Sequence, residues 1–164
     1  MTPDYQYLVA ADPLANVSAQ TLLMYDRLFS VAKTMNSTAT EAVTGVPTRY
    51  TSNTDTDPDS AVGNFLFIEC GTALPATAHN WTTCTYVDQS GNTGATLPSV
   101  TGNSSNIINR LDQPAATWFA PLASGDYGID SLTQMQCSAA VATGAIDFVI
   151  GHPIAWMPCA LANF

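Results

Sequence analysis

From residue 35 onward the chain is built of short apolar runs, which are separated by clusters of Gly, Pro, Asn and Asp. This spacing is typical of an all-β protein and not of alternating strands and helices. A length of 164 residues is enough for one hydrophobic core. We therefore predict an antiparallel β-sandwich, jelly-roll-like in its arrangement. The predicted strands cover residues 64–70, 81–87, 95–101, 116–122, 129–138 and 145–151, with weaker signals over 48–51 and 154–158.

The run over residues 129–138 shows the alternation of a half-buried strand most clearly. Its apolar positions, interleaved with polar ones, are Ile129, Leu132, Met135 and Cys137. The alternation slips near Ser131, which predicts a β-bulge. Because residues 124–128 have the Gly-Asp chemistry of a turn, we expect residues 116–122 to pair with 129–138 as one hairpin.

Residues 1–20 mix small residues, polar residues and prolines without a sustained period. They predict an extended arm, which at that length spans roughly 65 Å and can lie across a neighbouring subunit. A loosely packed first strand and loop fits the same residues equally well. The large apolar side chains available for contacts are Tyr5, Tyr7, Leu8 and Val9.

A short helix is predicted directly after this arm, over residues 19–34. Apolar residues recur there at helix-like intervals, and Ser18 can act as the N-cap. The residues that set the interval are Leu22, Leu23, Tyr25, Leu28, Phe29 and Ala32. Together with the strands, this helix completes one predicted domain over residues 21–164.

Charged residues make up only 10% of the chain, and the net charge is -9. The four basic residues, Arg27, Lys33, Arg49 and Arg110, are scattered singly. Nucleic-acid binding needs clustered Lys and Arg that displace counterions, so we expect no nucleic-acid partner. The chain also lacks a long apolar run and the basic, apolar start of a signal peptide. We expect synthesis in the cytoplasm and no membrane partner.

Three carboxylates at alternate positions, Asp55, Asp57 and Asp59, form the one candidate cation site. Oxygen-rich loops of this kind bind Ca²⁺. The loop fails as an EF-hand, because Ser60 and Leu66 stand where Gly and a bidentate Glu are required. A solvated acidic loop is therefore favoured over a metal site, and no cofactor is expected.

No motif of a catalytic nucleophile is present. The chain has no Gly-x-Ser-x-Gly elbow, and His152 is interpreted as a strand-end histidine that bonds a backbone group. The four cysteines, which lack zinc-site spacing, are Cys70, Cys84, Cys137 and Cys159. Buried thiols are favoured, although a Cys70–Cys84 disulfide stays open if the flanking runs pair as a hairpin. We expect no enzymatic activity.

The three tryptophans, Trp81, Trp118 and Trp156, each lie in or beside an apolar strand. Core packing is the simplest interpretation, with each indole N–H bonded at an edge. Trp81, which follows a loop, is also a candidate for an exposed interface anchor or a sugar-stacking surface. Trp156 would be a second interface anchor if it proves exposed.

Four segments, taken in order, resemble a group of small virion proteins of tailed bacteriophages that decorate or cement the outside of the head. These segments are Tyr25-Asp-Arg-Leu28, Arg49-Tyr-Thr51, Tyr86-Val-Asp-Gln-Ser-Gly91 and Pro121-Leu-Ala-Ser-Gly-Asp-Tyr-Gly-Ile129, and the resemblance covers residues 25–157. It implies binding to the major capsid protein on the outer capsid surface, stabilisation of the shell, and no active site. It also implies a homo-oligomer, with a trimer favoured.

Two other functions are compatible with a β-sandwich. A receptor- or glycan-binding module of a head or tail fibre would expose a shallow cleft around Trp81, Tyr86 and Asp88. A small hydrolase would need a deep pocket with perturbed acids, and nothing in the sequence points to one.

Overall fold

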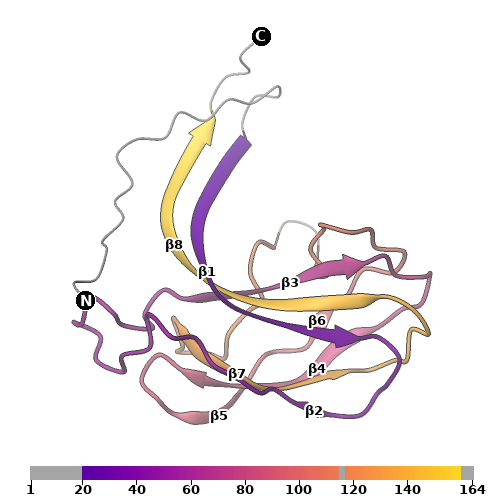
Figure 1. Ribbon diagram of the computed structural model, residues 1–164, viewed down its shortest axis with the longest axis horizontal. Helices are drawn as coiled ribbons and strands as arrows, with labels where there is room; N and C mark the ends of the chain where they lie inside the picture. Colours follow the sequence, from indigo (N-terminus) through magenta and orange to yellow (C-terminus); the bar gives the residue numbers. More distant parts are fainter. Residues whose placement is uncertain (1–19, 115–116, 160–164) are drawn as a thin grey trace, which may run out of the picture. The chain divides into compact units, whose positions relative to one another are not determined.

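The computed structural model describes residues 20–114 and 117–159, and these residues form eight strands and no helix (Figure 1). The strands are β1 (Gln20–Thr34), β2 (Glu41–Ala42), β3 (Phe65–Thr72), β4 (Asn80–Asp88), β5 (Thr93–Thr96), β6 (Val100–Thr101), β7 (Ile129–Cys137) and β8 (Ala145–Cys159). The sheets are antiparallel. The prediction of an all-β, antiparallel fold is therefore confirmed.

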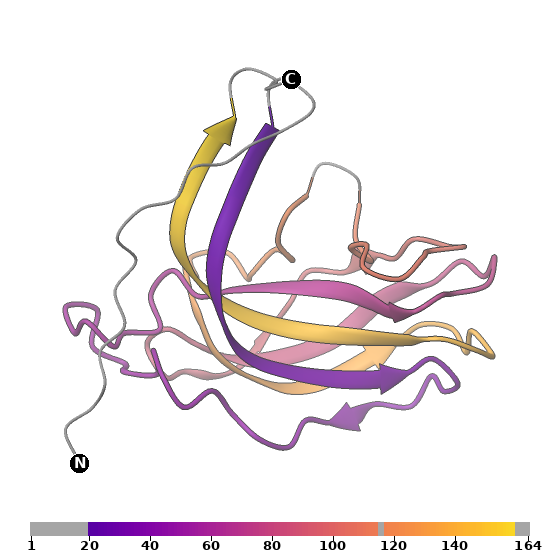
Figure 2. The same cartoon turned by 45° about the horizontal axis from the view of Figure 1, so that its top comes forward.

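The described residues divide into two compact units. The larger unit, residues 26–153, is called the body. The smaller unit is called the ribbon, and its described part consists of residues 20–25 of β1 and residues 154–159 of β8. Both views show these two strand ends side by side (Figures 1 and 2). The predicted arm over residues 1–20 lies almost wholly outside the described residues.

Two sheets make up the body. The first has the strand order β1-β8-β3, and the second has the order β2-β7-β4-β5, with β6 paired to β4. In the first sheet Phe65 lies opposite Gly151, and the register runs on to Cys70 opposite Ile146. In the second sheet Trp81 lies opposite Cys137. Figure 1 shows β3 and β8 of the first sheet facing β4 and β7 of the second.

The hydrophobic core lies between these sheets and takes side chains from both. Leu66, Ile68, Phe148 and Ile150 come from the first sheet, and they are fully buried. The Trp81 ring meets the Phe148 ring edge-on across the interface, with centroids 4.8 Å apart. This contact fixes how closely the two sheets approach at one point.

The predicted helix over residues 19–34 is wrong, because residues 20–34 form β1. Phe29, Val31, Lys33 and Met35 are turned toward the core with a period of two, and Ser30, Ala32 and Thr34 between them are exposed. A charged residue at an inward position hid this alternation. Pairing with β8 then outweighs the weak local preference for a helix.

The predicted hairpin between residues 116–122 and 129–138 is also wrong. Residues 117–122 form no strand, and β7 pairs with β4 and β2 instead. Pro114 and Pro121 remove backbone donors from this stretch. The predicted bulge near Ser131 is confirmed, because the β4–β7 register shifts between Ser131 and Ile129.

Residues 109–112 cover the outer edge of β3. Cys70 N donates to Arg110 O at 2.8 Å, Asn109 N donates to Cys70 O at 2.9 Å, and Asp112 N donates to Ile68 O at 2.7 Å. Bonds of this kind satisfy the backbone groups that an edge strand would otherwise leave open.

Candidate functional site

A buried carboxylate, Asp112, organises the loop that covers β3. Its Oδ2 accepts hydrogen bonds from His79 Nε2 at 2.8 Å and Trp81 Nε1 at 2.9 Å. Its Oδ1 accepts from Asn103 N at 2.9 Å and Asn106 Nδ2 at 3.1 Å. Because all four donors converge on one side chain that solvent does not reach, Asp112 ties the loop to the start of β4.

The geometry calls for a charged imidazolium at His79. Nδ1 lies 3.1 Å from Thr77 O and Nε2 lies 2.8 Å from Asp112 Oδ2, and both partners are acceptors, so each ring nitrogen must carry a proton. The hydrogen bond to Asp112 raises the pKa of His79 and outweighs burial, which would lower it. Burial alone would raise the pKa of Asp112, but the bonds from His79, Asn103 and Trp81 together lower it.

Gly102 makes room for this ion pair. A Cβ atom at Gly102 would lie 2.2 Å from His79 Nε2 and 2.9 Å from Asp112 Oδ2. Gly102 N also donates to His79 O at 3.0 Å. Glycine is therefore required here by close approach and not by backbone conformation.

An open pocket of about 520 Å³ lies in the same loop, lined in part by Asn103, Asn106, Arg110 and Thr117. Most of its polar groups already have partners in the protein. Asn103 Nδ2 donates to Leu111 O and to the backbone oxygen of the next glutamine, and Thr117 Oγ1 donates to a backbone oxygen at 2.5 Å. These groups stabilise the loop and leave few donors for a ligand.

Arg110 differs from the other basic residues. Arg27 pairs with Glu69 at 3.2 Å, Arg49 pairs with Asp26 at 2.7 Å, and Lys33 contacts Glu41. Within the described part of the chain, Arg110 is the one Lys or Arg outside an ion pair. A single exposed guanidinium is a weak site for an anion in a protein of net charge -9.

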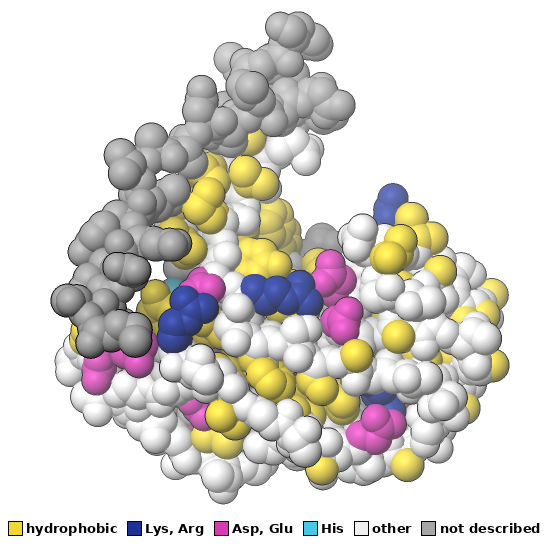
Figure 3. All heavy atoms as spheres, in the orientation of Figure 1, with side chains coloured by type: hydrophobic (Ala, Val, Ile, Leu, Met, Phe, Trp, Pro, Cys, Tyr) yellow, Lys and Arg dark blue, Asp and Glu magenta, His cyan; other side chains and the backbone are white. Residues whose placement is uncertain are grey.

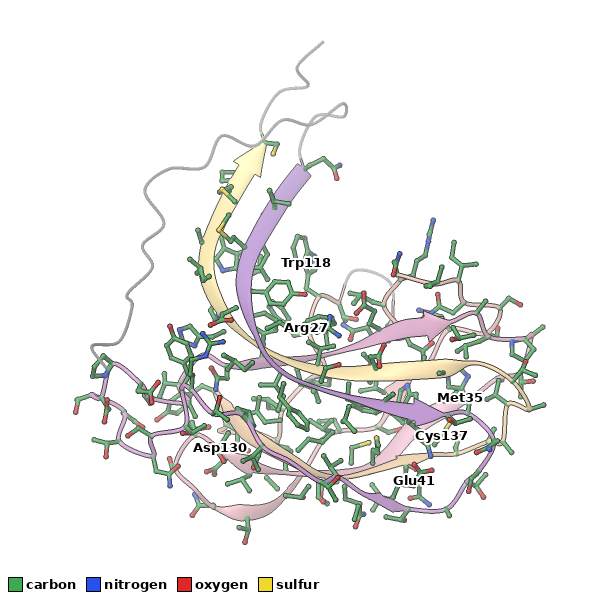
Figure 4. The ribbon with its side chains drawn as sticks, viewed as in Figure 1. Arg27, Met35, Glu41, Trp118, Asp130 and Cys137 are labelled. Atoms are coloured by element: carbon green, nitrogen blue, oxygen red, sulfur yellow. The ribbon has the colours of Figure 1, made fainter. Side chains whose placement is uncertain are left out.

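Lys33 is fully buried on β1, and its ammonium contacts the Glu41 carboxylate of β2. Figure 4 places Glu41 at the margin of the second sheet, with Met35 and Cys137 between the sheets. A charge that points inward on an edge strand is a device that opposes pairing with another chain. The pair therefore both joins β1 to β2 and protects this stretch of β1.

The acidic loop does not gather its carboxylates around one point. Asp55 Oδ2 accepts from Tyr127 OH at 2.7 Å, Asp57 Oδ1 accepts from the backbone N of Asp59 at 3.0 Å, and Asp59 Oδ1 accepts from Tyr50 N at 2.6 Å. Within residues 20–114 and 117–159, no three His, Cys, Asp or Glu side chains are placed to hold a metal ion. The three carboxylates shape the turn.

His152 bonds a side chain and not the backbone group that was predicted. Its Nδ1 lies 2.8 Å from Asn64 Oδ1, and its ring stacks on Tyr50 with centroids 3.9 Å apart. Asn64 Nδ2 donates to Tyr50 O and Ile129 O, so its oxygen must accept from the histidine. Burial lowers the pKa of His152, consistent with a neutral ring that fastens β8 to this loop.

The four cysteines are buried, and none of them forms a disulfide bond. Cys70 lies on β3 in the first sheet and Cys84 on β4 in the second, so the hairpin that would join them is not formed. Burial raises the pKa of the Cys84 thiol to about 11, which keeps it protonated and unreactive at neutral pH.

The structure tests some of the predicted interface residues and not others. Tyr5, Tyr7, Leu8 and Val9 lie outside the described residues. The prediction of Trp81 as an exposed anchor is wrong, because its side chain is 1% exposed and its indole N–H is bonded to Asp112. Trp156 is 49% exposed and so meets the condition set for an anchor.

The ribbon carries the exposed apolar side chains Leu22, Ile154 and Trp156, each about half exposed. Its two segments, Gln-Thr-Leu-Leu-Met-Tyr and Ile-Ala-Trp-Met-Pro-Cys, contain no Asp, Glu, Lys or Arg. Figure 3 shows hydrophobic side chains along the ribbon and a body surface that is mostly uncharged and polar. An uncharged apolar patch of this kind is typical of an interaction surface.

Comparisons with protein-family models, with curated proteins and with solved structures gave no match to this chain. The described part of the chain contains no helix that could span a membrane. Function is therefore inferred from the residues and their geometry.

Proposed function

We propose that this protein is a structural virion protein that binds the major capsid protein on the outer surface of a tailed-phage head and stabilises the capsid. The ribbon carries this proposal, because it is an uncharged apolar element attached to a body that has a complete core of its own. A decoration or cement protein needs a stable scaffold and a docking element, and it needs no active site.

The strand pairing supports a jelly-roll-like fold for the body. A jelly roll is a long antiparallel hairpin rolled on itself, so eight strands pair as first with eighth, second with seventh, third with sixth, and fourth with fifth. Three of these pairs, β1–β8, β2–β7 and β4–β5, are present. On β3 the place of the fourth pair is taken by residues 109–112, with a bridge between Glu69 and Leu111. Jelly rolls are common in viral capsid proteins, and this remains an analogy of fold.

Ile154 and Trp156 are the proposed contacts with the capsid. They stand two residues apart on β8, so their side chains lie on one face of the strand. Tryptophan is enriched among the residues that dominate binding energy, and a neighbouring apolar side chain helps to exclude water. Docking by this face would bury apolar groups that are half exposed in the free protein.

The alternative, a receptor- or glycan-binding module, has less support. Trp81 and Tyr86, which would line the glycan cleft, are buried in the core. The open pocket beside Asn103 and Asn106 is lined by amides that are bonded within the protein. A sugar site needs polar groups whose hydrogen bonds are left for the ligand.

Sedimentation with decoration-free heads tests the proposal. Purified protein is mixed with heads, the particles are pelleted, and bound copies per shell are counted by gel densitometry. The wild-type protein is expected to saturate at a count set by the symmetry of the shell. The double variant Ile154→Ser, Trp156→Ser is expected to bind at least about tenfold more weakly, the effect of losing one hot spot.

A matched control replaces two apolar side chains of the body that are equally exposed, Ile107→Ser and Ile108→Ser. This control is expected to bind as the wild-type protein does. If wild-type protein fails to pellet with heads, the virion role is wrong, and a glycan array becomes the next test. If the ribbon variant and the wild type bind equally, the ribbon is not the docking element.

A further inference from the structure

The two strands of the ribbon, β1 and β8, differ in how readily their outer edges can pair with another strand. β8 lies between β1 and β3 in the first sheet, but β3 pairs only with residues 145–151 of β8. Within the described residues, the ribbon is therefore a two-stranded sheet with two open edges. An open edge presents unpaired N–H and C=O groups, onto which another strand can add.

The β8 edge is poorly suited to strand addition. Pro158 lies inside its ribbon segment, and Pro153 precedes it directly. Proline has no N–H to donate to a new strand, which is why it is tolerated at sheet edges and opposes further pairing there.

The β1 edge has none of these protective features. Residues 20–25 contain no Pro, no Gly and no charged side chain, and their Thr and Tyr are strong strand formers. Protection begins at the next residue. Asp26 is paired with Arg49, Arg27 is paired with Glu69, and Lys33 points inward to Glu41. The open, unprotected part of β1 is thus confined to one six-residue segment.

We infer that residues 20–25 of β1 pair with the same residues of a second copy of this chain, as antiparallel strands about a twofold axis. Six residues in extended conformation span about 20 Å, which is an ordinary strand length. The pairing would join two ribbons into one four-stranded sheet of order β8-β1-β1-β8. A two-stranded sheet is marginal in water, whereas three or more strands with an apolar face are stable.

The charge distribution favours an identical partner at this edge. With a net charge of -9, two copies repel each other over most of their surfaces. The ribbon is uncharged, so two copies can meet there without placing like charges opposite one another. A twofold contact between identical segments closes on itself, so it gives a dimer and not a filament.

This inference rests on the proposed use of the ribbon as an interaction element, and it names a second copy as the partner of the β1 edge. It differs from the trimer that the family resemblance implies. Self-association is measured without heads, so the two proposals can fail separately. If the protein is a dimer but does not pellet with heads, only the proposed capsid role is wrong. If it is a monomer that binds heads, only the proposed β1 pairing is wrong.

A charge swap at Leu22 tests the pairing. Leu22 is about half exposed near the middle of the segment, so in the dimer it lies close to its own copy across the axis. Light scattering after gel filtration, over a dilution series, is expected to show twice the 17.3 kDa monomer mass for the wild type. Leu22→Lys and Leu22→Asp are each expected to raise the dimer dissociation constant at least about tenfold.

An equimolar mixture of the two Leu22 variants is expected to recover the dimer, because opposite charges then face each other. Recovery also shows that both variants are folded. Ile107→Lys and Ile107→Asp, at an equally exposed position of the body, are the matched controls and are expected to dimerise as the wild type does. A monomeric or trimeric wild type, undiminished dimers of both Leu22 variants, or a mixture that stays monomeric would overturn the inference.

Discussion

β1 and β8 each contribute to both the body and the ribbon, but their side chains meet different surroundings in the two. In the body, Ile146, Phe148 and Ile150 stand at alternate positions of β8 and are fully buried, and Val149 between them is fully buried as well. In the ribbon, Ile154 and Trp156 keep the same two-residue spacing and are about half exposed. The same pattern of apolar residues therefore builds a core in one region and an apolar surface in the other. An alternating pattern of apolar residues predicts that one face of a strand is buried. It does not identify the element or the partner that buries it.

The largest difference between the two regions is expected when a core side chain of β8 is truncated. Phe148→Ala leaves a cavity beside Trp81, because the two rings meet edge-on at 4.8 Å. We expect the free energy of unfolding to fall by about 3–5 kcal/mol. Urea denaturation followed by tryptophan fluorescence measures it. A loss below about 1 kcal/mol would mean that the body does not depend on this core.

Removing the charge of Asp112 is expected to have the next largest effect. Asp112→Asn keeps the shape but replaces an acceptor of four hydrogen bonds, and it leaves the His79 imidazolium without its counter-charge. Breaking a buried ion pair in this way costs about 3 kcal/mol. Asp55→Asn in the exposed acidic loop serves as the control, with an unchanged unfolding midpoint. Equal midpoints for the two variants would contradict a special role for Asp112.

The pH dependence of stability is expected to carry the signature of the same pair. The pKa of His79 is raised above 6.5, so its contribution is complete below pH 6.5 and is lost as pH rises through the folded-state value. The pKa of Asp112 is lowered below 3.8, so its contribution is present above pH 3.8 and is lost as pH falls through the folded-state value. Together they place the maximum between these two ordinary values.

Urea midpoints measured from acid to alkaline pH for wild type and for the double variant His79→Gln, Asp112→Asn give the contribution of the pair by difference. The difference is expected to peak in mildly acidic solution and to shrink on both sides. A difference that is constant with pH would show that the two groups are not coupled in the folded protein.

The smallest effect on stability is expected in the ribbon. Trp156→Ala removes a side chain that is 49% exposed, so the free energy of unfolding should change by less than about 1 kcal/mol. Head binding, in contrast, should weaken strongly. The comparison with Phe148→Ala is sharpest when both variants are measured under identical conditions. A ribbon variant as destabilised as the core variant would mean that Trp156 belongs to the folding core.

Two strands could be predicted from the sequence for different reasons. Residues 65–72 begin with a continuous apolar run, Phe-Leu-Phe-Ile, and residues 129–137 alternate apart from the slip near Ser131. β1 could not, because its inward position 33 is a lysine that is tolerated only through Glu41 on another strand. Residues 93–96 and 100–101 form two strands where one was predicted over 95–101, because Pro98 interrupts the ladder.

The Asp112 network had no signature in the sequence. His79 and Asp112 are 33 residues apart, and Leu111-Asp112-Gln113 forms no motif of its own. One signal was available, because a buried indole N–H needs an acceptor and Trp81 therefore required a polar partner nearby. The identity of that partner depends on how the loop folds back over β3, which local residue patterns do not specify.

The most direct test is hydrogen exchange, resolved along the full chain and measured over a dilution series. It tests whether the body is stable by itself and whether the ribbon becomes protected only when it binds a second copy. Amides of β3 (Phe65–Thr72) are expected to exchange only at the rate of global unfolding and to be insensitive to dilution. Amides of residues 20–25 are expected to exchange faster, and to slow as protein concentration rises. Equal protection of both segments at every concentration would contradict this account.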